Sequence, residues 1–165
     1  MNWDAISAIS ETIASVAVVV SLVYLAMQVK HSNKLSQSQT RTDLRHMAQS
    51  EVFKMIDYPE ICQAFFKEEL TEQEAIQLHN FLISALRFRE FIWRQYQLNL
   101  LDEETFRNYM KAVLQVLGSD RNRRWWDTYK NTTFDPDFIA YIDDLSASQP
   151  KTDLRGFWDS IRKKG

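Results

Sequence analysis

Side chains that could carry chemistry are few in this chain and are scattered along it. Three histidines, His31, His46 and His79, lie on different segments without the spacing of metal ligands, so we expect surface residues and no metal site. No glycine-rich phosphate loop, HExxH, CxxC or nucleophile elbow occurs. One arginine and one histidine, Arg41 and His46 in "RTDLRH", stand with four residues between them and are the weak catalytic candidates of this chain. Chance supplies such a pair in about half of chains of this composition, so a solvated basic stalk is the alternative.

A long uncharged segment near the N-terminus predicts where the rest of the chain lies relative to a membrane. Between Glu11 and Lys30 lie 18 uncharged residues, including "TIASVAVVVSLVYLAM". As a helix they extend about 27 Å, close to the roughly 30 Å of bilayer hydrocarbon. Their aliphatic side chains cover most of the circumference, whereas a helix on a soluble core needs only one apolar stripe. The sequence therefore predicts a transmembrane helix within residues 1–31.

The flanks of this segment predict its orientation. Asp4 and Glu11 precede it, whereas a cleaved signal peptide begins with bases. Lys30 and Lys34 follow it, so the positive-inside rule places the N-terminus outside and the body in the cytoplasm. We expect a membrane protein whose first partner is the lipid bilayer.

Small and polar residues recur within the predicted span at alternating spacings of three and four. Small residues let transmembrane backbones approach closely, and hydroxyl groups can bond across the contact. This seam predicts a helix–helix interface in a homo-oligomer or a larger membrane complex, although a lone anchor would also tolerate it. Glu11 lies beside the seam, either among headgroups or, if deeper, against a partner or a water-filled path. The seam consists of Ser7, Ser10, Ala14, Ala17, Ser21, Tyr24 and Gln28.

The rest of the chain predicts helices, because Gly and Pro are rare and Leu, Glu, Gln and Arg are plentiful. Residues 32–57 form a helical stalk that either continues the span or breaks near Ser32. Residues 58–148 form an antiparallel bundle, with a capping box at Thr71-Glu72-Gln73-Glu74, caps at Asp102 and at Ser119 or Asp120, and an Asp135-Pro136 start. The fold class is all-α: a transmembrane helix and a cytoplasmic bundle of five or six helices.

Arg89 falls in the middle of the apolar face of the longest bundle helix. A base there needs a partner, since an unpaired buried charge costs several kcal/mol. An ion pair that fixes two helices and a ligand-binding arginine are both consistent with this position. Glu90 lies on the opposite face, spaced to pair with Arg87 and Arg94 in solvent.

Residues 149–165 form a basic amphipathic tail. Its apolar side chains recur at helical spacing between five bases, which is typical of a helix on an anionic leaflet. The same face could instead dock on the bundle, and the sequence does not separate the two. These apolar residues are Leu154, Phe157, Trp158 and Ile161.

Three stretches, in this order, resemble a broad family of uncharacterised bacterial proteins with one N-terminal membrane helix. They are "NWDAISAI" leading into "VAVVVSLVYLAMQVK", then "REFIWRQYQLNLLDEETF", then "RRWWDTYKNTTFDPDFIAYID". The resemblance implies a helical cytoplasmic domain on a bacterial inner-membrane anchor, with Glu90 and Trp126 at family-typical positions, and no known activity. Asn99 departs from it, because such proteins often carry Gly there.

The layout is also similar, more faintly, to membrane-anchored HEPN-like accessory proteins of RNA-targeting CRISPR systems. That resemblance would make Arg41 and His46 a ribonuclease pair. "RNRRWW" mixes bases with aromatic residues as nucleic-acid surfaces do. Ten acids against four bases in residues 55–105 oppose broad nucleic-acid affinity, however.

We therefore expect a non-enzymatic scaffold or accessory subunit of a membrane complex, without a cofactor. The alternative is a membrane effector of a defence system, either an oligomeric pore or a HEPN-like ribonuclease.

Overall fold

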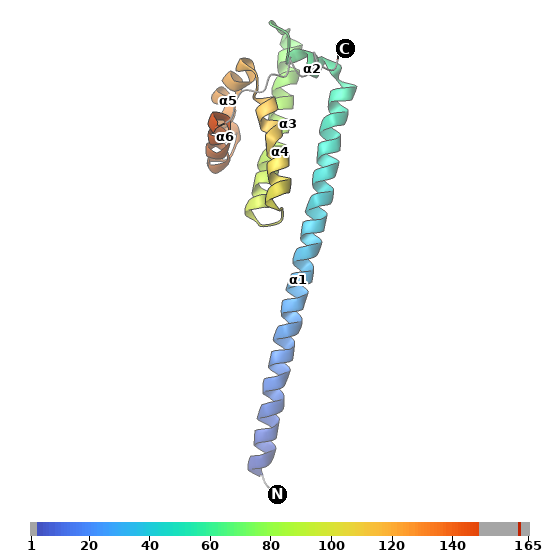
Figure 1. The fold of residues 1–165 in the computed structure, drawn as a ribbon, viewed down its shortest axis with the longest axis vertical. Helices are drawn as coiled ribbons and strands as arrows, with labels where there is room; N and C mark the ends of the chain where they lie inside the picture. Colours follow the sequence, from blue (N-terminus) through green and yellow to red (C-terminus); the bar gives the residue numbers. More distant parts are fainter. Residues whose placement is uncertain (1–2, 149–161, 163–165) are drawn as a thin grey trace. The chain divides into compact units, whose positions relative to one another are not determined.

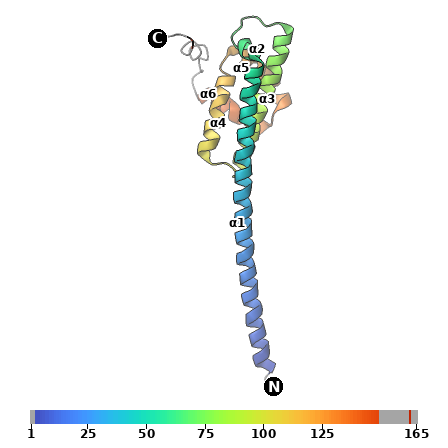
Figure 2. The same cartoon turned by 90° about the vertical axis from the view of Figure 1, so that its right-hand side faces the viewer.

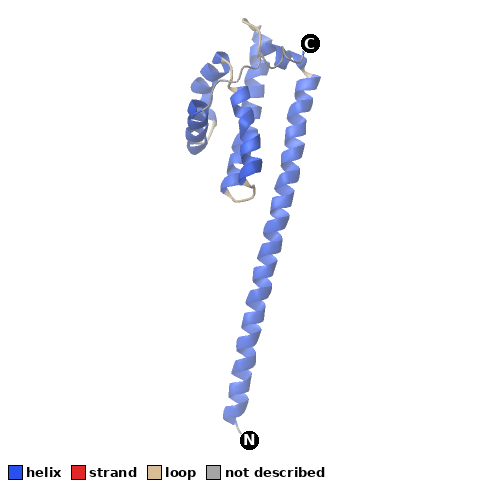
Figure 3. Cartoon of the chain, in the orientation of Figure 1, coloured by secondary structure: helices blue, strands red, loops and turns tan. Residues whose placement is uncertain are grey.

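The computed structural model describes residues 3–148 and residue 162. The described chain is all-α, as the sequence predicts, and contains six helices and no strand (Figures 1 and 3). The helices are α1 (Trp3–Asp57), α2 (Pro59–Ala64), α3 (Glu72–Gln97), α4 (Glu103–Val116), α5 (Asp120–Thr133) and α6 (Pro136–Ser148).

The chain separates into two compact units, residues 1–40 and 41–165. The boundary falls inside α1, so residues 41–57, which the sequence assigns to the stalk, belong to the same unit as the helical domain. The helix does not break at Ser32. The leaflet-contact residues Leu154, Phe157, Trp158 and Ile161 lie outside the described residues.

In the first unit, α1 is long and apolar enough to cross a membrane. None of its most apolar stretch is buried by protein within the described chain. Between Ile13 and Leu25 the exposed fractions of the aliphatic side chains are all between 53% and 64%, so no face of this stretch is covered. The residues concerned are Ile13, Val16, Val18, Val19, Val20, Leu22, Val23 and Leu25.

Helices α3, α4 and α5 of the second unit begin at capping residues that the sequence predicts. The Thr71 hydroxyl accepts from the Glu74 N–H, while the Glu74 carboxylate accepts from the Thr71 N–H, which completes the capping box. The carboxylate of Asp102 and the hydroxyl of Ser119 accept backbone N–H groups at the starts of α4 and α5. These bonds satisfy amides that a helix leaves unpaired at its first turn.

Asn99 ends α3 in place of the glycine that the resemblance implies. Its φ of 56° lies in the left-handed region, which asparagine tolerates better than other residues with a side chain. The N–H of Leu100 donates to the carbonyl of Gln95, and the N–H of Asn99 to that of Tyr96. This is the Schellman pattern of a glycine-terminated helix.

The hydrophobic core of the second unit is formed around α3. Helices α3 and α4 run antiparallel beside each other (Figures 1 and 2) and bury Leu82, Leu86, Ile92 and Val113. Leu44 from α1, at 1% exposed, belongs to the same core. Rings from α3, α5 and α6 extend it, where Phe138 packs against Trp93, Trp126 and Phe134.

Candidate functional site

The seam of small and polar residues in α1 is exposed along its whole length, from Ser7 to Gln28. The Ser21 hydroxyl donates to the carbonyl of Ala17 at 2.8 Å, and the Ser15 hydroxyl to that of Glu11, also at 2.8 Å. Both protons are therefore used within the helix, and Ser21 would meet a neighbouring helix as an acceptor. The main feature of the seam is therefore the small size of side chains such as Ala14, Ala17 and Ser21.

Glu11 lies on an exposed part of α1. Its position, among headgroups or beside a water-filled path, stays a prediction.

Arg41 and His46 lie against different hollows of the second unit. Arg41 pairs with Asp102 at 3.2 Å in a hollow between α1 and α4, and the Asp102 pKa is lowered, first by hydrogen bonds from Thr105. The exposed His46 borders a second hollow with Lys54 of α1 and residues of α3. Five residues on a helix place two side chains about 140° apart. The structure does not bring this pair together, and the ribonuclease hypothesis stays a prediction.

Arg89 is buried, with 6% of its surface exposed, and Glu51 of α1 is its partner. Nη1 of Arg89 donates to Oε2 of Glu51 at 2.6 Å and lies 3.4 Å from the carbonyl of Ala85. The pair joins α1 to α3, as the ion-pair interpretation of the sequence requires. Nε of Arg89 is buried and has no hydrogen-bond partner. A buried donor without a partner costs about 1 to 3 kcal/mol, so an acceptor at this edge of the guanidinium would stabilise the fold.

Glu90 is not in solvent, contrary to the sequence-based expectation, because the start of α6 covers it. It is 6% exposed and accepts from the backbone N–H of Asp135 at 2.9 Å and from Nη1 of Arg87 at 2.6 Å. Arg94 pairs with Asp135 at 2.8 Å instead of with Glu90. The carboxylate therefore ties α3 to the turn between α5 and α6.

Trp126, the other family-typical position, is buried and also holds α6. Its Nε1 donates to Oδ1 of Asp143 at 2.8 Å, while Lys130 donates to Oδ2 at 2.9 Å. The hydrogen bond to Asp143 is the main cause of a raised Lys130 pKa. Glu90 thus joins α3 to the turn before α6, and Trp126 joins α5 to α6.

His79 is half-buried, whereas the sequence predicts a surface residue. Its Nδ1 accepts from Nε1 of Trp125 at 2.9 Å, and its ring lies edge-on to Trp125 and Tyr129. The imidazole therefore has a structural role between α3 and α5, and His31 and His46 are exposed.

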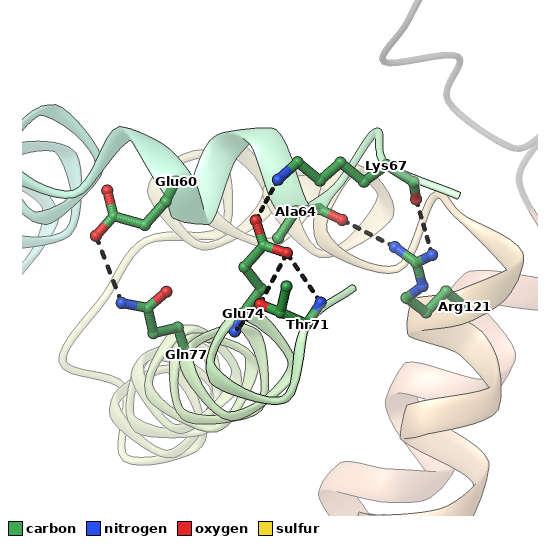
Figure 4. Close-up of polar contacts among 7 residues, drawn as sticks. All are labelled: Glu60, Ala64, Lys67, Thr71, Glu74, Gln77 and Arg121. Carbon is green, nitrogen blue, oxygen red and sulfur yellow. Dashed lines mark hydrogen bonds and ion pairs between the residues drawn. The ribbon is translucent and has the colours of Figure 1, made fainter. Parts of the chain in front are cut away.

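Arg121 is a residue that sequence reasoning missed. Figure 4 shows it reaching from α5 to the end of α2 and the chain that follows, where Nη1 donates to the carbonyl of Ala64 at 2.9 Å and Nη2 to that of Lys67 at 2.8 Å. Nothing in "RNRRWW" separates this arginine from its neighbours, because the carbonyls that it binds lie more than 50 residues earlier. The bonds from Arg121 to these carbonyls join α5 to the end of α2 and the chain after it.

Lys67 and Glu74 form an ion pair beside Arg121 in the same view (Figure 4). The hydrogen bond from Lys67 is the largest cause that lowers the pKa of Glu74 to about 2. The residues that the structure describes contain no group of three His, Cys, Asp or Glu side chains that could hold a metal.

Comparison with known protein families, with curated proteins and with solved structures gives no match to this chain.

Proposed function

We propose that this chain is a single-pass protein of the bacterial inner membrane that acts without catalysis, as an oligomeric scaffold or as an accessory subunit of a membrane complex. Its N-terminus would lie outside and its helical domain in the cytoplasm. This proposal includes membership of the family of uncharacterised membrane-anchored proteins that the sequence resembles.

The uncovered apolar helix carries the proposal. A folded protein in water does not leave an 18-residue apolar segment exposed on every side, since each buried aliphatic side chain contributes about 1.5 to 3 kcal/mol. Lipid is the solvent that suits such a surface, and the bases Lys30 and Lys34 at one end suit the cytoplasmic side.

The seam supports assembly. Lipid tails are as apolar as the helix, so association in the bilayer depends on close packing and not on hydrophobic burial. Ala14, Ala17 and Ser21 leave the backbone of α1 open to close approach, while the larger aliphatic residues lie around the rest of the helix. A second copy or another transmembrane helix is the occupant that such a surface fits.

Native mass analysis of the full chain in mild detergent tests this proposal. We expect a defined oligomer, or a complex with another membrane protein, and a strict monomer that co-purifies with nothing would overturn it. Ala17→Leu adds three carbons to the seam and should shift the population toward monomer.

Ala26→Leu is the matched control for Ala17→Leu. It makes the same change inside the span at an exposed position, about 160° around the helix from Tyr24 of the seam. The control should keep the wild-type stoichiometry. If both variants dissociate equally, or neither does, the seam is not the interface.

A further inference from the structure

The second unit contains a cavity of about 280 Å³ between the end of α1, the segment around α2, α3 and α4. Its walls are mainly apolar, with Val52, Met55, Phe65, Phe81 and Val116 among them. This volume is near the lower end of the range for small-molecule sites and has room for roughly nine groups of the size of a water molecule.

The ion pair of Arg89 and Glu51 contributes, together with Gln115, the polar part of the cavity wall. The arginine uses Nη1 for Glu51, while Nε has no partner and is buried. A guanidinium binds oxygen acceptors best along one edge, and the edge that contains Nε is the one left over. Arg89 therefore contributes to the wall of the cavity, and its Nε lies buried behind that wall without an acceptor, so that a ligand reaches it only when the side chain shifts.

The charge of the pair limits which acceptor fits. Glu51 already neutralises Arg89, so a second carboxylate would leave an excess negative charge in surroundings of low dielectric, which is costly. A neutral carbonyl oxygen would satisfy the donor without adding charge. The apolar walls suit a hydrocarbon chain next to that oxygen.

We propose that this cavity binds a small uncharged amphiphile, a carbonyl compound with a medium-length hydrocarbon chain. Its oxygen accepts from the Nε edge of Arg89 after a small side-chain adjustment, and its chain lies among Met55, Phe65 and Val116. The site is independent of the membrane seam and of the assembly proposed above.

Cys62 provides a reporter for this site. It lines the cavity, is partly buried, and is the one cysteine of the chain. Burial raises the pKa of its thiol, so its alkylation near neutral pH is slow and depends on access to the cavity.

The experiment follows alkylation of Cys62 by N-ethylmaleimide in the full chain in lipid nanodiscs, using intact mass as the readout. Saturating octanamide should slow the reaction at least tenfold, and octanoate at the same concentration should have much less effect. An unchanged rate with octanamide would overturn the proposal, and so would equal protection by octanoate.

One matched pair of variants and one single variant separate binding in this cavity from general partitioning into the nanodisc. Ala112→Phe fills the cavity and should abolish protection, while Ala140→Phe makes the same change at an exposed position of α6 and should preserve it. Arg89→Lys keeps a positive charge for Glu51 but loses the Nε edge. It should raise the octanamide concentration for half-protection about tenfold.

The arginine variant keeps the proposal testable if Ala112→Phe fails to fold, which circular dichroism would reveal. If Arg89→Lys is protected at the same octanamide concentration as the wild type, the assigned donor is wrong.

Discussion

Residues 3–40 and residues 41–57 belong to the same helix, α1, yet their apolar side chains are arranged differently. In the first segment, aliphatic residues cover most of the circumference, and Val19 and Leu22 are 58% and 60% exposed. In the second, Leu44 is 1% exposed and shares one face with the half-buried Ala48 and Met55. A helix that meets a protein core on one side needs only a stripe, whereas a helix surrounded by lipid needs apolar residues all round.

Matched truncations in the two segments give the strongest test of this difference. Leu44→Ala should destabilise the helical domain by about 2 to 5 kcal/mol, because it leaves a cavity in the core. Leu22→Ala should change the same free energy of unfolding by less than about 0.5 kcal/mol. Urea denaturation in mild detergent, followed by tryptophan fluorescence, measures both free energies of unfolding. Equal effects would contradict the assignment of Leu44 to the protein core and of Leu22 to the membrane span.

Breaking the ion pair between α1 and α3 should give the next largest loss in the free energy of unfolding. Glu51→Ala leaves Arg89 buried without its partner and should cost about 2 to 3 kcal/mol, less than for a fully buried pair because Glu51 is partly exposed. The double variant Glu51→Leu/Arg89→Met should recover much of this loss, since apolar residues can replace such a pair. The same denaturation measures it, and a double variant no more stable than the single one would show that the charges themselves are needed.

Glu74 offers a smaller, pH-dependent effect in the second unit. Its pKa is lowered to about 2 from an ordinary 4.5, so the folded state binds this proton less readily than the unfolded chain. The contribution is therefore fully present above pH 4.5 and is lost as the pH falls toward 2. The wild type should lose stability relative to Glu74→Gln across this range. NMR titration of the carboxyl group checks the assignment, and Lys67→Met should raise the pKa.

The smallest effect is expected at the end of α3. Asn99→Gly should stabilise the domain by about 0.5 kcal/mol, because glycine takes a positive φ without steric cost. Asn99→Ala should destabilise it by about 1 kcal/mol. Thermal unfolding by circular dichroism measures both, and a more stable alanine variant would contradict the role of the left-handed backbone.

Local signals explain why much of the fold could be predicted from the sequence. Thr71 and Glu74, Asp102 and Ser119 bond to amides within three residues, so the starts of α3, α4 and α5 follow from nearby residues alone. The membrane-length helix follows equally from its own residues. Asn99 stands where the resemblance implies a glycine, and it has the positive φ and the hydrogen bonds of a Schellman helix end.

The candidate site was less predictable, because its partners are distant in the sequence. Arg89 required a partner, but Glu51 lies 38 residues earlier, and several other acids would have satisfied the same reasoning. Glu90 was expected in solvent because its own helix gives no sign of α6, which begins 46 residues later. The cavity beside Arg89 has walls from four separate segments, so no residue spacing along the chain predicts it.

The helical class, the helix starts and the apolar length of the span follow from the amino-acid sequence alone, because each depends on interactions within a few turns of one helix. The pairing of Glu51 with Arg89, the covering of Glu90 by Asp135, and the cavity between the end of α1 and the helices around it follow only from helix packing. These features depend on how helices pack across dozens of residues of chain, where small differences in side-chain volume select one arrangement.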